Sequence, residues 1–149
     1  MLLASCQPDT GCRQETKVTA GVSVEWNKVD TMGVSTRITQ WDSVTVQGVG
    51  TDSILYSNAR SINELRLPLR PDTSLTEYEI TWHGLTERLR IYHDNDRRYI
   101  SMACGCIIFH TLDTVVSDQI FIEKAEIVNA AVENYEQTNI HLTLATISE

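Results

Sequence analysis

The chain has few basic residues, few prolines and no long apolar run. Its 149 residues include 12 Lys and Arg against 20 Asp and Glu, a formal charge of −8. Phosphate binding needs a basic surface, so this charge argues against nucleic acid as a partner. No apolar run approaches the roughly 18–20 residues with which a helix spans a bilayer. The composition therefore excludes a polytopic helical membrane protein.

The sequence also lacks the short motifs that announce common enzymes. It contains no G-x-S-x-G, no P-loop, no dinucleotide-binding glycine pattern and no H-E-x-x-H. The four histidines are scattered, without the close spacing of a metal site. Only His83 and His93, which flank a hairpin expected over residues 81–94, could approach each other. We therefore predict a protein that is not an enzyme and that holds no cofactor or metal.

Alternation of apolar and polar residues predicts strands along most of the chain. In 17–27, Val and Trp side chains fall on one face and polar side chains on the other, which is typical of a half-buried strand. Eight to ten such strands, without a βαβ rhythm, predict an all-β fold. The expected architecture is an antiparallel sandwich of immunoglobulin or transthyretin type, and a small calycin-like barrel is the alternative. The predicted core comprises Trp26, Ile38, Trp82, Ile91, Ile100, Ile108, Ile122, Ile140 and Leu142.

Two segments and one tryptophan do not follow the simple alternation of strand residues. Residues 123–136 have helical spacing but lie among strands, so we expect two short strands there. Asp94-Asn95-Asp96 is expected to form a tight turn. Trp26 and Trp82 fall on core faces, whereas Trp41 does not. Trp41 is thus the weak candidate for an exposed platform that stacks on a sugar ring, and a place in the core is the favoured alternative.

The first six residues carry a recognisable pattern. Leu3-Ala4-Ser5-Cys6 resembles the lipobox of bacterial lipoprotein signal peptides, which implies lipid attachment to Cys6. A working signal also needs a basic segment and an apolar segment before the cysteine. Either the true start lies upstream of Met1 or the match is accidental, and the polar stretch 7–11, typical of a tether, favours the first.

The lipoprotein interpretation divides the chain into three parts and predicts that the protein lies in an oxidising compartment. Residues 1–5 are the remnant of a signal peptide, 6–16 a tether and 17–149 one β domain. Exported cysteines tend to pair. With Cys6 carrying lipid, Cys12 is expected to pair with Cys104 or Cys106, leaving one thiol free.

The cysteine pair at 104 and 106 leaves alternatives open. Cys104-Gly105-Cys106 lies in a run whose pattern indicates a strand, which would put both thiols on the face of Ile100, Met102 and Ile108. Cysteines in such a place form a disulfide or stay as buried thiols, and a zinc site is a third alternative with an unusual spacing.

The domain as a whole resembles small uncharacterised cell-envelope lipoproteins of Bacteroidetes. The resemblance rests on Cys6 and Cys12, Leu65-x-Leu67-Pro68-Leu69, Tyr99-Ile100-Ser101-x-x-Cys104-Gly105 and Asn139-Ile140-x-Leu142. It implies a lipid anchor on Cys6 and a β-rich domain. The first hypothesis is therefore a non-enzymatic lipoprotein of the outer membrane, on the periplasmic or the surface face, with an interaction or structural role. The partner would be an envelope protein or a glycan. The alternative is a soluble periplasmic domain that binds a ligand or glycan.

Overall fold

The computed structural model describes residue 12 and residues 15–148, and this part of the chain contains strands and no helix. The all-β prediction is therefore confirmed. The strands are β1 (Thr19–Val29), β2 (Ser35–Ile38), β3 (Val44–Gly48), β4 (Ile54–Ala59), β5 (Glu64–Pro68), β6 (Leu75–Trp82), β7 (Leu85–Ser101), β8 (Gly105–Ser117), β9 (Ile122–Ile127), β10 (Ala131–Val132), β11 (Thr138–Leu144) and β12 (Ile147–Ser148).

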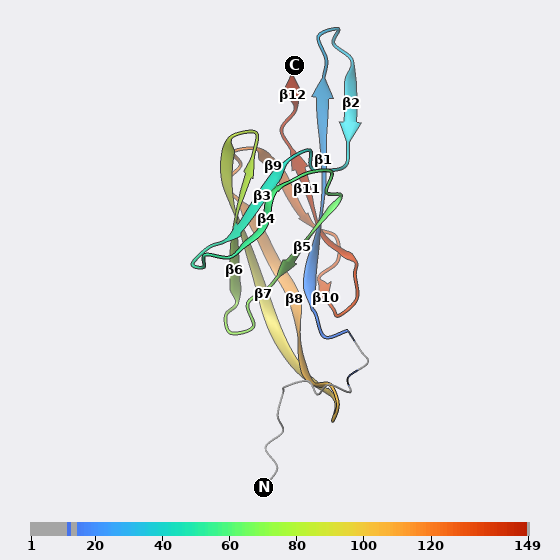
Figure 1. The fold of residues 1–149 in the computed structure, drawn as a ribbon, viewed down its shortest axis with the longest axis vertical. Helices are drawn as coiled ribbons and strands as arrows, with labels where there is room; N and C mark the ends of the chain where they lie inside the picture. The colour runs from blue at the N-terminus through green and yellow to red at the C-terminus, as the bar shows by residue number, and fades with distance from the viewer. Residues whose placement is uncertain (1–11, 13–14, 149) are drawn as a thin grey trace.

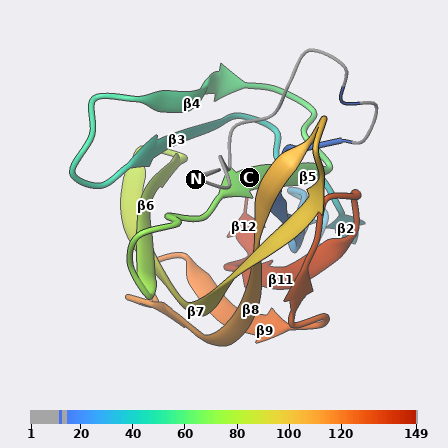
Figure 2. The ribbon, with the colours of Figure 1, turned by 90° about the horizontal axis from the view of Figure 1, so that it is seen from below.

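The strands form two six-stranded sheets. The first sheet has the order β12-β1-β11-β9, with β2 and β5 also paired to β1. The second has the order β10-β8-β7-β6-β3-β4 and is antiparallel throughout. Viewed along the long axis, the strands make a curved wall around a shared interior (Figure 2). The sheets thus combine features of a sandwich and a barrel, but β1 runs parallel to β11 and β12, which the sequence did not predict.

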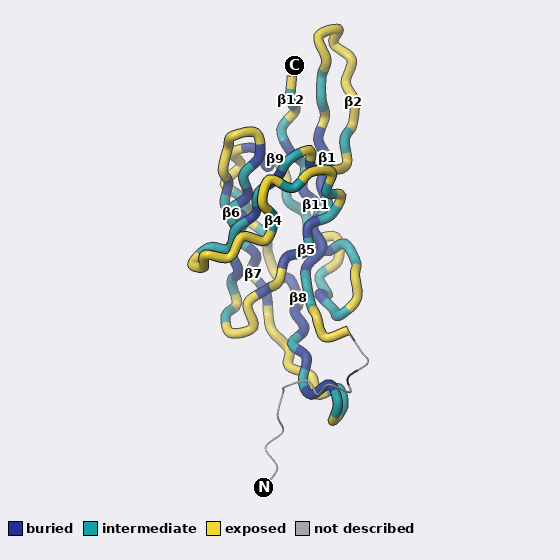
Figure 3. Tube along the Cα trace, viewed as in Figure 1, coloured by how far each residue is buried: buried dark blue, intermediate teal, exposed yellow. Residues whose placement is uncertain are grey.

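The core follows the period-two pattern of the strands. In β6, buried and half-buried positions alternate from Leu75 to Trp82, and the buried positions of the tube line the inside of the body (Figure 3). Most of the predicted core is confirmed, and the buried members are Trp26, Trp82, Ile91, Ile122, Ile140 and Leu142. The half-buried members are Ile38, Ile100 and Ile108.

Trp41 belongs to this core, so its predicted role as an exposed platform is wrong. Its side chain is 0% exposed, and its ring lies edge-on to Trp82 with 6.1 Å between the centroids. Trp41 forms an isolated bridge to Ile62 rather than part of a strand. Period-two reading assigns faces only within strands, which is why the sequence pattern misplaced it.

The longest hairpin corrects two further predictions. Residues 94–96 do not turn but continue β7, because β8 pairs with each of them, for example Asp96 with Phe109. Ladder pairing outweighs the local turn preference of Asp and Asn. The turn falls at residues 102–104 instead. Cys104 is therefore in the turn and not in a strand beside Met102, which is 86% exposed.

The segment 123–136 is strand-like, as predicted. β9 pairs with β11 and β10 pairs with β8. The helical spacing of its apolar residues is overridden because two existing strands offer ladder partners on either side.

The molecule is elongated, with different elements at its two ends (Figure 1). The β7–β8 turn lies at one end. At the other end the β1–β2 hairpin and β12 extend beyond the body. Met32 and Val34 at the hairpin tip are 87% and 57% exposed.

A buried carboxylate fixes the connection between β8 and β9. Glu87 is 1% exposed, and its Oε1 accepts hydrogen bonds from the backbone N–H groups of Ile120, Phe121 and Ile122 at 3.1, 2.7 and 2.8 Å. A buried carboxylate is tolerated where it satisfies several donors. Glu87 therefore replaces the strand pairing that this segment lacks.

Truncation of Glu87 should destabilise the fold. We expect Glu87→Ala to lower the free energy of unfolding by about 3 kcal/mol or more, because buried N–H groups lose their acceptor at about 1–3 kcal/mol each. Glu87→Gln keeps an acceptor oxygen and should lose less. The control is Glu123→Ala at an exposed position, where a change within about 0.5 kcal/mol is expected. Urea denaturation measures all three, and equal effects of Glu87→Ala and Glu123→Ala would contradict the assignment.

Candidate functional site

One polar cavity lies on the outer face of the second sheet, where β3, β4 and β6 meet the β6–β7 turn. Thr45 of β3 and Thr81 of β6 are register partners, so their side chains share that face. The cavity has a volume of about 220 Å³. Its lining consists of Ser43, Thr45, Asn58, Thr81, His83 and Gly84. We call the cavity lined by these six residues the polar cavity.

Local backbone irregularities bring Asn58 and His83 into the polar cavity. Between Val46↔Tyr56 and Val44↔Ala59, β4 has one more residue than β3, so Asn58 lies in a β-bulge, with φ of 47°. His83 and Gly84 form the two-residue β6–β7 turn, with φ of 49° and 77°. Non-glycine residues with positive φ cluster at functional sites because the fold must hold them there.

Asp42 holds His83 in place. His83 Nε2 donates to Asp42 Oδ2 at 2.8 Å, and the buried Trp82 donates its Nε1–H to Asp42 Oδ1 at 2.7 Å. Burial raises the pKa of Asp42, but the hydrogen bond from Trp82 and the charge and hydrogen bond of His83 outweigh it. The net pKa of Asp42 lies below its ordinary value. The His83 ring also lies edge-on to Trp82, with 4.5 Å between centroids.

The polar cavity offers both donors and acceptors. Ser43 Oγ donates to Asn58 Oδ1, and the backbone N–H of Asn58 donates to Thr45 Oγ1 at 2.9 Å. Within the described part of the chain, Asn58 Nδ2 and His83 Nδ1 have no hydrogen-bond partner. A hydroxyl group both donates and accepts, so it is the natural counterpart of this lining.

A second polar cluster joins β7 to β8. Asn95 Oδ1 accepts from His93 Nδ1 at 2.8 Å and from His110 Nδ1 at 2.7 Å. The amide nitrogen of Asn95 donates to the carbonyl oxygens of Pro71 and Thr73. Because an amide oxygen only accepts, both imidazoles carry their proton on Nδ1. His93 Nε2 then accepts from the hydroxyl of Thr76 at 2.8 Å.

These two histidines are held neutral. His93 and His110 are 1% and 4% exposed. Burial lowers the pKa of His93, and burial together with the neighbouring His93 lowers the pKa of His110 to about 4. His110 also lines a cavity of about 310 Å³ whose other walls are largely apolar, including Val18, Leu69 and Ile107.

A third cluster has the residue types of a hydrolase triad but not its surroundings. Ser23 Oγ lies 2.7 Å from His141 Nδ1, and His141 Nε2 lies 3.1 Å from Glu25 Oε1. Hydrolysis also needs backbone N–H groups that stabilise an oxyanion. β1 is paired with β11 on one side of Ser23 and with β5 on the other. The ladder therefore occupies the amides around this serine, and the arrangement serves to link the two strands.

His83 and His93, which the sequence allowed to approach each other, do not do so. His83 lies at the turn of the β6–β7 hairpin, whereas His93 follows the register pair Leu75↔Tyr92 at the opposite end of that ladder. The partner of His93 is His110 on β8, with 5.1 Å between ring centroids. Among the described residues no group of three or more His, Cys, Asp or Glu side chains is arranged to hold a metal ion.

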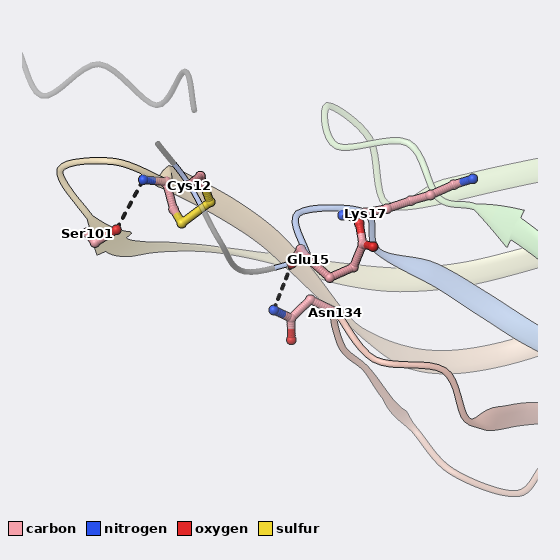
Figure 4. The surroundings of a disulfide bond; sticks show 6 residues. Cys12, Glu15, Lys17, Ser101 and Asn134 are labelled. Atoms are coloured by element: carbon pink, nitrogen blue, oxygen red, sulfur yellow. Dashed lines mark hydrogen bonds between the residues drawn. A yellow bond between two sulfur atoms is a disulfide. The ribbon is translucent and has the colours of Figure 1, made fainter. Parts of the chain in front are cut away.

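A disulfide joins Cys12 to Cys104, across 92 residues of sequence (Figure 4). It attaches the chain ahead of β1 to the β7–β8 turn, where Ser101 Oγ accepts from the Cys104 N–H at 3.0 Å. Closing a loop of this length stabilises a fold by roughly 4–5 kcal/mol in the chain-entropy account. The predicted disulfide of Cys12 is confirmed. Cys106 is also disulfide-bonded, so the expected free thiol is wrong for the described cysteines.

The structure does not test the predictions made for the first residues of the chain. Cys6, the signal remnant 1–5 and most of the tether 6–16 lie outside the described residues. In the part of the chain that the structure describes, no helix is long and apolar enough to cross a membrane.

Comparison with known proteins places the chain in a family. Residues 43–144 match the model of DUF6452, a family of unknown function. Since the match covers more than half of the chain, the protein belongs to this family. No curated protein and no solved structure matches the chain. The matched range includes all six residues of the polar cavity and both histidines of the β7–β8 cluster, but not Cys12.

Sequence reasoning missed the polar cavity, although one signal was present. A two-residue turn ending in glycine between alternating runs predicts a hairpin at His83-Gly84. The bulge at Asn58 and the approach of Asp42 to His83, 41 residues apart, depend on the pairing of β3 with β4 and β6. No pattern in the sequence carries that information.

Protonation of His110 should destabilise the fold. The fold favours the neutral ring, while the unfolded chain takes up a proton near the ordinary value of 6.5. Stability is therefore complete above pH 6.5 and falls as the pH drops toward 4, by up to about 3 kcal/mol at about 1.4 kcal/mol per pKa unit.

Urea denaturation from pH 7 to pH 4 measures this effect. His110→Asn keeps a donor near the Nδ1 position but does not titrate, so its stability should change less over this interval than that of the natural chain. The comparison removes the contribution of the carboxylates, which both chains share. Parallel stability curves for the two chains would contradict the assignment.

Proposed function

We propose that this protein is an exported, lipid-anchored β domain of the cell envelope that acts by binding and not by catalysis. The observation that carries the proposal is the Cys12–Cys104 disulfide. Structural disulfides persist in oxidising compartments and are rare in the cytosol of most organisms. Export agrees with the lipobox-like Leu3-Ala4-Ser5-Cys6 ahead of it.

The geometry supports an anchor at one end of the molecule. Cys12 follows Cys6 by six residues and is tied to the β7–β8 turn. A lipid on Cys6 would therefore hold this turn near the membrane. Each buried methylene of an acyl chain contributes about 0.8 kcal/mol, so several chains hold a small domain firmly. The proposed location is the outer membrane, on its periplasmic or surface face.

The opposite end is then available to a partner in the envelope. The β1–β2 hairpin extends away from the disulfide end (Figure 1) and exposes Met32 at its tip. The non-catalytic role belongs to the same proposal: Ser23, which lies 2.7 Å from His141 Nδ1, stands between two paired strands whose ladders occupy the surrounding amides. The partner is an envelope protein or a glycan.

Intact mass of the protein isolated from its own host tests the anchor. We expect a chain that begins at Cys6, carries added acyl mass and gains hydrogen on reduction of Cys12–Cys104. Cys6→Ser should move the protein from the membrane fraction to the soluble fraction. Cys12→Ser, which removes the disulfide but not the attachment site, is the matched control and should stay with the membrane.

Two results would contradict the anchor. One is an unmodified chain that keeps the residues before Cys6. The other is a chain without acyl mass that gains four hydrogens on reduction, because a sulfur that carries lipid cannot also form a disulfide. The same spectrum reports the state of Cys106, which is disulfide-bonded in the structure.

A further inference from the structure

We infer that the polar cavity binds a neutral, hydroxyl-rich ligand, namely a single sugar ring or the end of a saccharide chain. The inference deepens the binding role proposed above, but it does not depend on the lipid anchor. Its basis is the chemistry of the six lining residues and the way in which the fold holds them.

The lining selects for hydroxyl groups. Five of its six residues carry a hydroxyl, an amide or an imidazole, and the sixth is glycine. Hydroxyls and amides both donate and accept, as sugar hydroxyls do. The unpartnered Asn58 Nδ2 supplies a donor, and the unpartnered His83 Nδ1 supplies an acceptor while the ring is neutral. A ligand with neighbouring hydroxyls can satisfy both groups.

Charge and size narrow the ligand class further. No Lys or Arg lines the cavity, and the only cationic candidate, His83, is already paired with Asp42. An anion would therefore lack a free positive partner. A volume of about 220 Å³ lies below the roughly 300–1,000 Å³ of pockets for drug-sized molecules. One ring fits this description better than a larger compound.

The polar cavity is held in shape before a ligand arrives. Asp42 and Trp82 fix the His83 ring, the bulge in β4 fixes Asn58, and register pairing fixes Thr45 and Thr81. A preorganised site loses little conformational entropy on binding. The positive φ at both Asn58 and His83 is strain that the surrounding sheet maintains.

Titration of the full chain with neutral methyl glycosides of glucose, galactose, mannose and N-acetylglucosamine tests the inference. We expect at least one to bind with Kd on the order of 1 mM, as a small ligand with a few hydrogen bonds would. Binding should change the tryptophan fluorescence, because His83 lies 4.5 Å from Trp82 and 6.0 Å from Trp26 between ring centroids. Calorimetry measures the affinity independently.

Two variants that should still fold locate the site. His83→Asn removes the imidazole but leaves Asn-Gly, a favoured pair for this turn. Asn58→Gly removes the amide and accepts the positive φ. Each should weaken binding by about tenfold or more, as expected for the loss of about 1.4 kcal/mol. Gln119→Gly, at a position of the β8–β9 loop that also has positive φ (57°), is the matched control and should bind as the natural chain does.

Three outcomes would overturn the inference. The first is no heat and no fluorescence change with any glycoside at ten times the expected Kd. The second is binding that survives both His83→Asn and Asn58→Gly. The third is competition by inorganic phosphate or sulfate, which would identify an anion site. None of these results bears on the acyl mass of the chain, so the anchor and the ligand are tested separately.

Discussion

The antiparallel ladder between β7 and β8 is the constraint on which the rest of the structure depends. It runs from Leu89↔Ser117 to Ser101↔Gly105. Three groups of contacts along its length attach other parts of the chain to it. Near its start, Glu87 accepts hydrogen bonds from the backbone of the segment that leads into β9. At its middle, Asn95 joins the two buried histidines. At its far end the turn holds Cys104 and, through it, Cys12. Without continuous pairing through residues 94–99 these points would have no common frame.

Polar groups inside this protein are arranged by shared acceptors. One oxygen of Glu87 accepts three N–H groups, one oxygen of Asn95 accepts two imidazoles, and the carboxylate of Asp42 accepts from Trp82 and His83. Buried donors cost free energy when unpaired, so each acceptor decides where several side chains lie. The first two serve the fold. The third positions a residue that lines a cavity, and there the arrangement leaves hydrogen-bonding groups free for a ligand.

The sequence predicted the elements better than the site. Strands such as β1 and β6 could be predicted because a half-buried strand alternates apolar and polar residues with a period of two. The two strands in 123–136 were predicted because the segments on either side are strands. The failures have specific causes. Asp94-Asn95-Asp96 has turn residues but lies opposite β8, and tertiary pairing overrode the local preference. Trp41 lies outside regular strands, where alternation says nothing of its face. The polar cavity combines residues from 43 to 84, whose approach depends on strand pairing.

By itself, the sequence determined the all-β class, most of the core and the pairing of Cys12 with either Cys104 or Cys106. These properties follow from local alternation and from the chemistry of single residue types. The tertiary structure alone decided the parallel pairing of β1 with β11, the choice of Cys104 as partner, and the meeting of His93 with His110 and of Asp42 with His83. Each of these is a contact between segments far apart in the chain. Their geometry is set by strand register and by a β-bulge. Both decide which side chains meet across strands, and neither can be detected in the pattern of apolar residues.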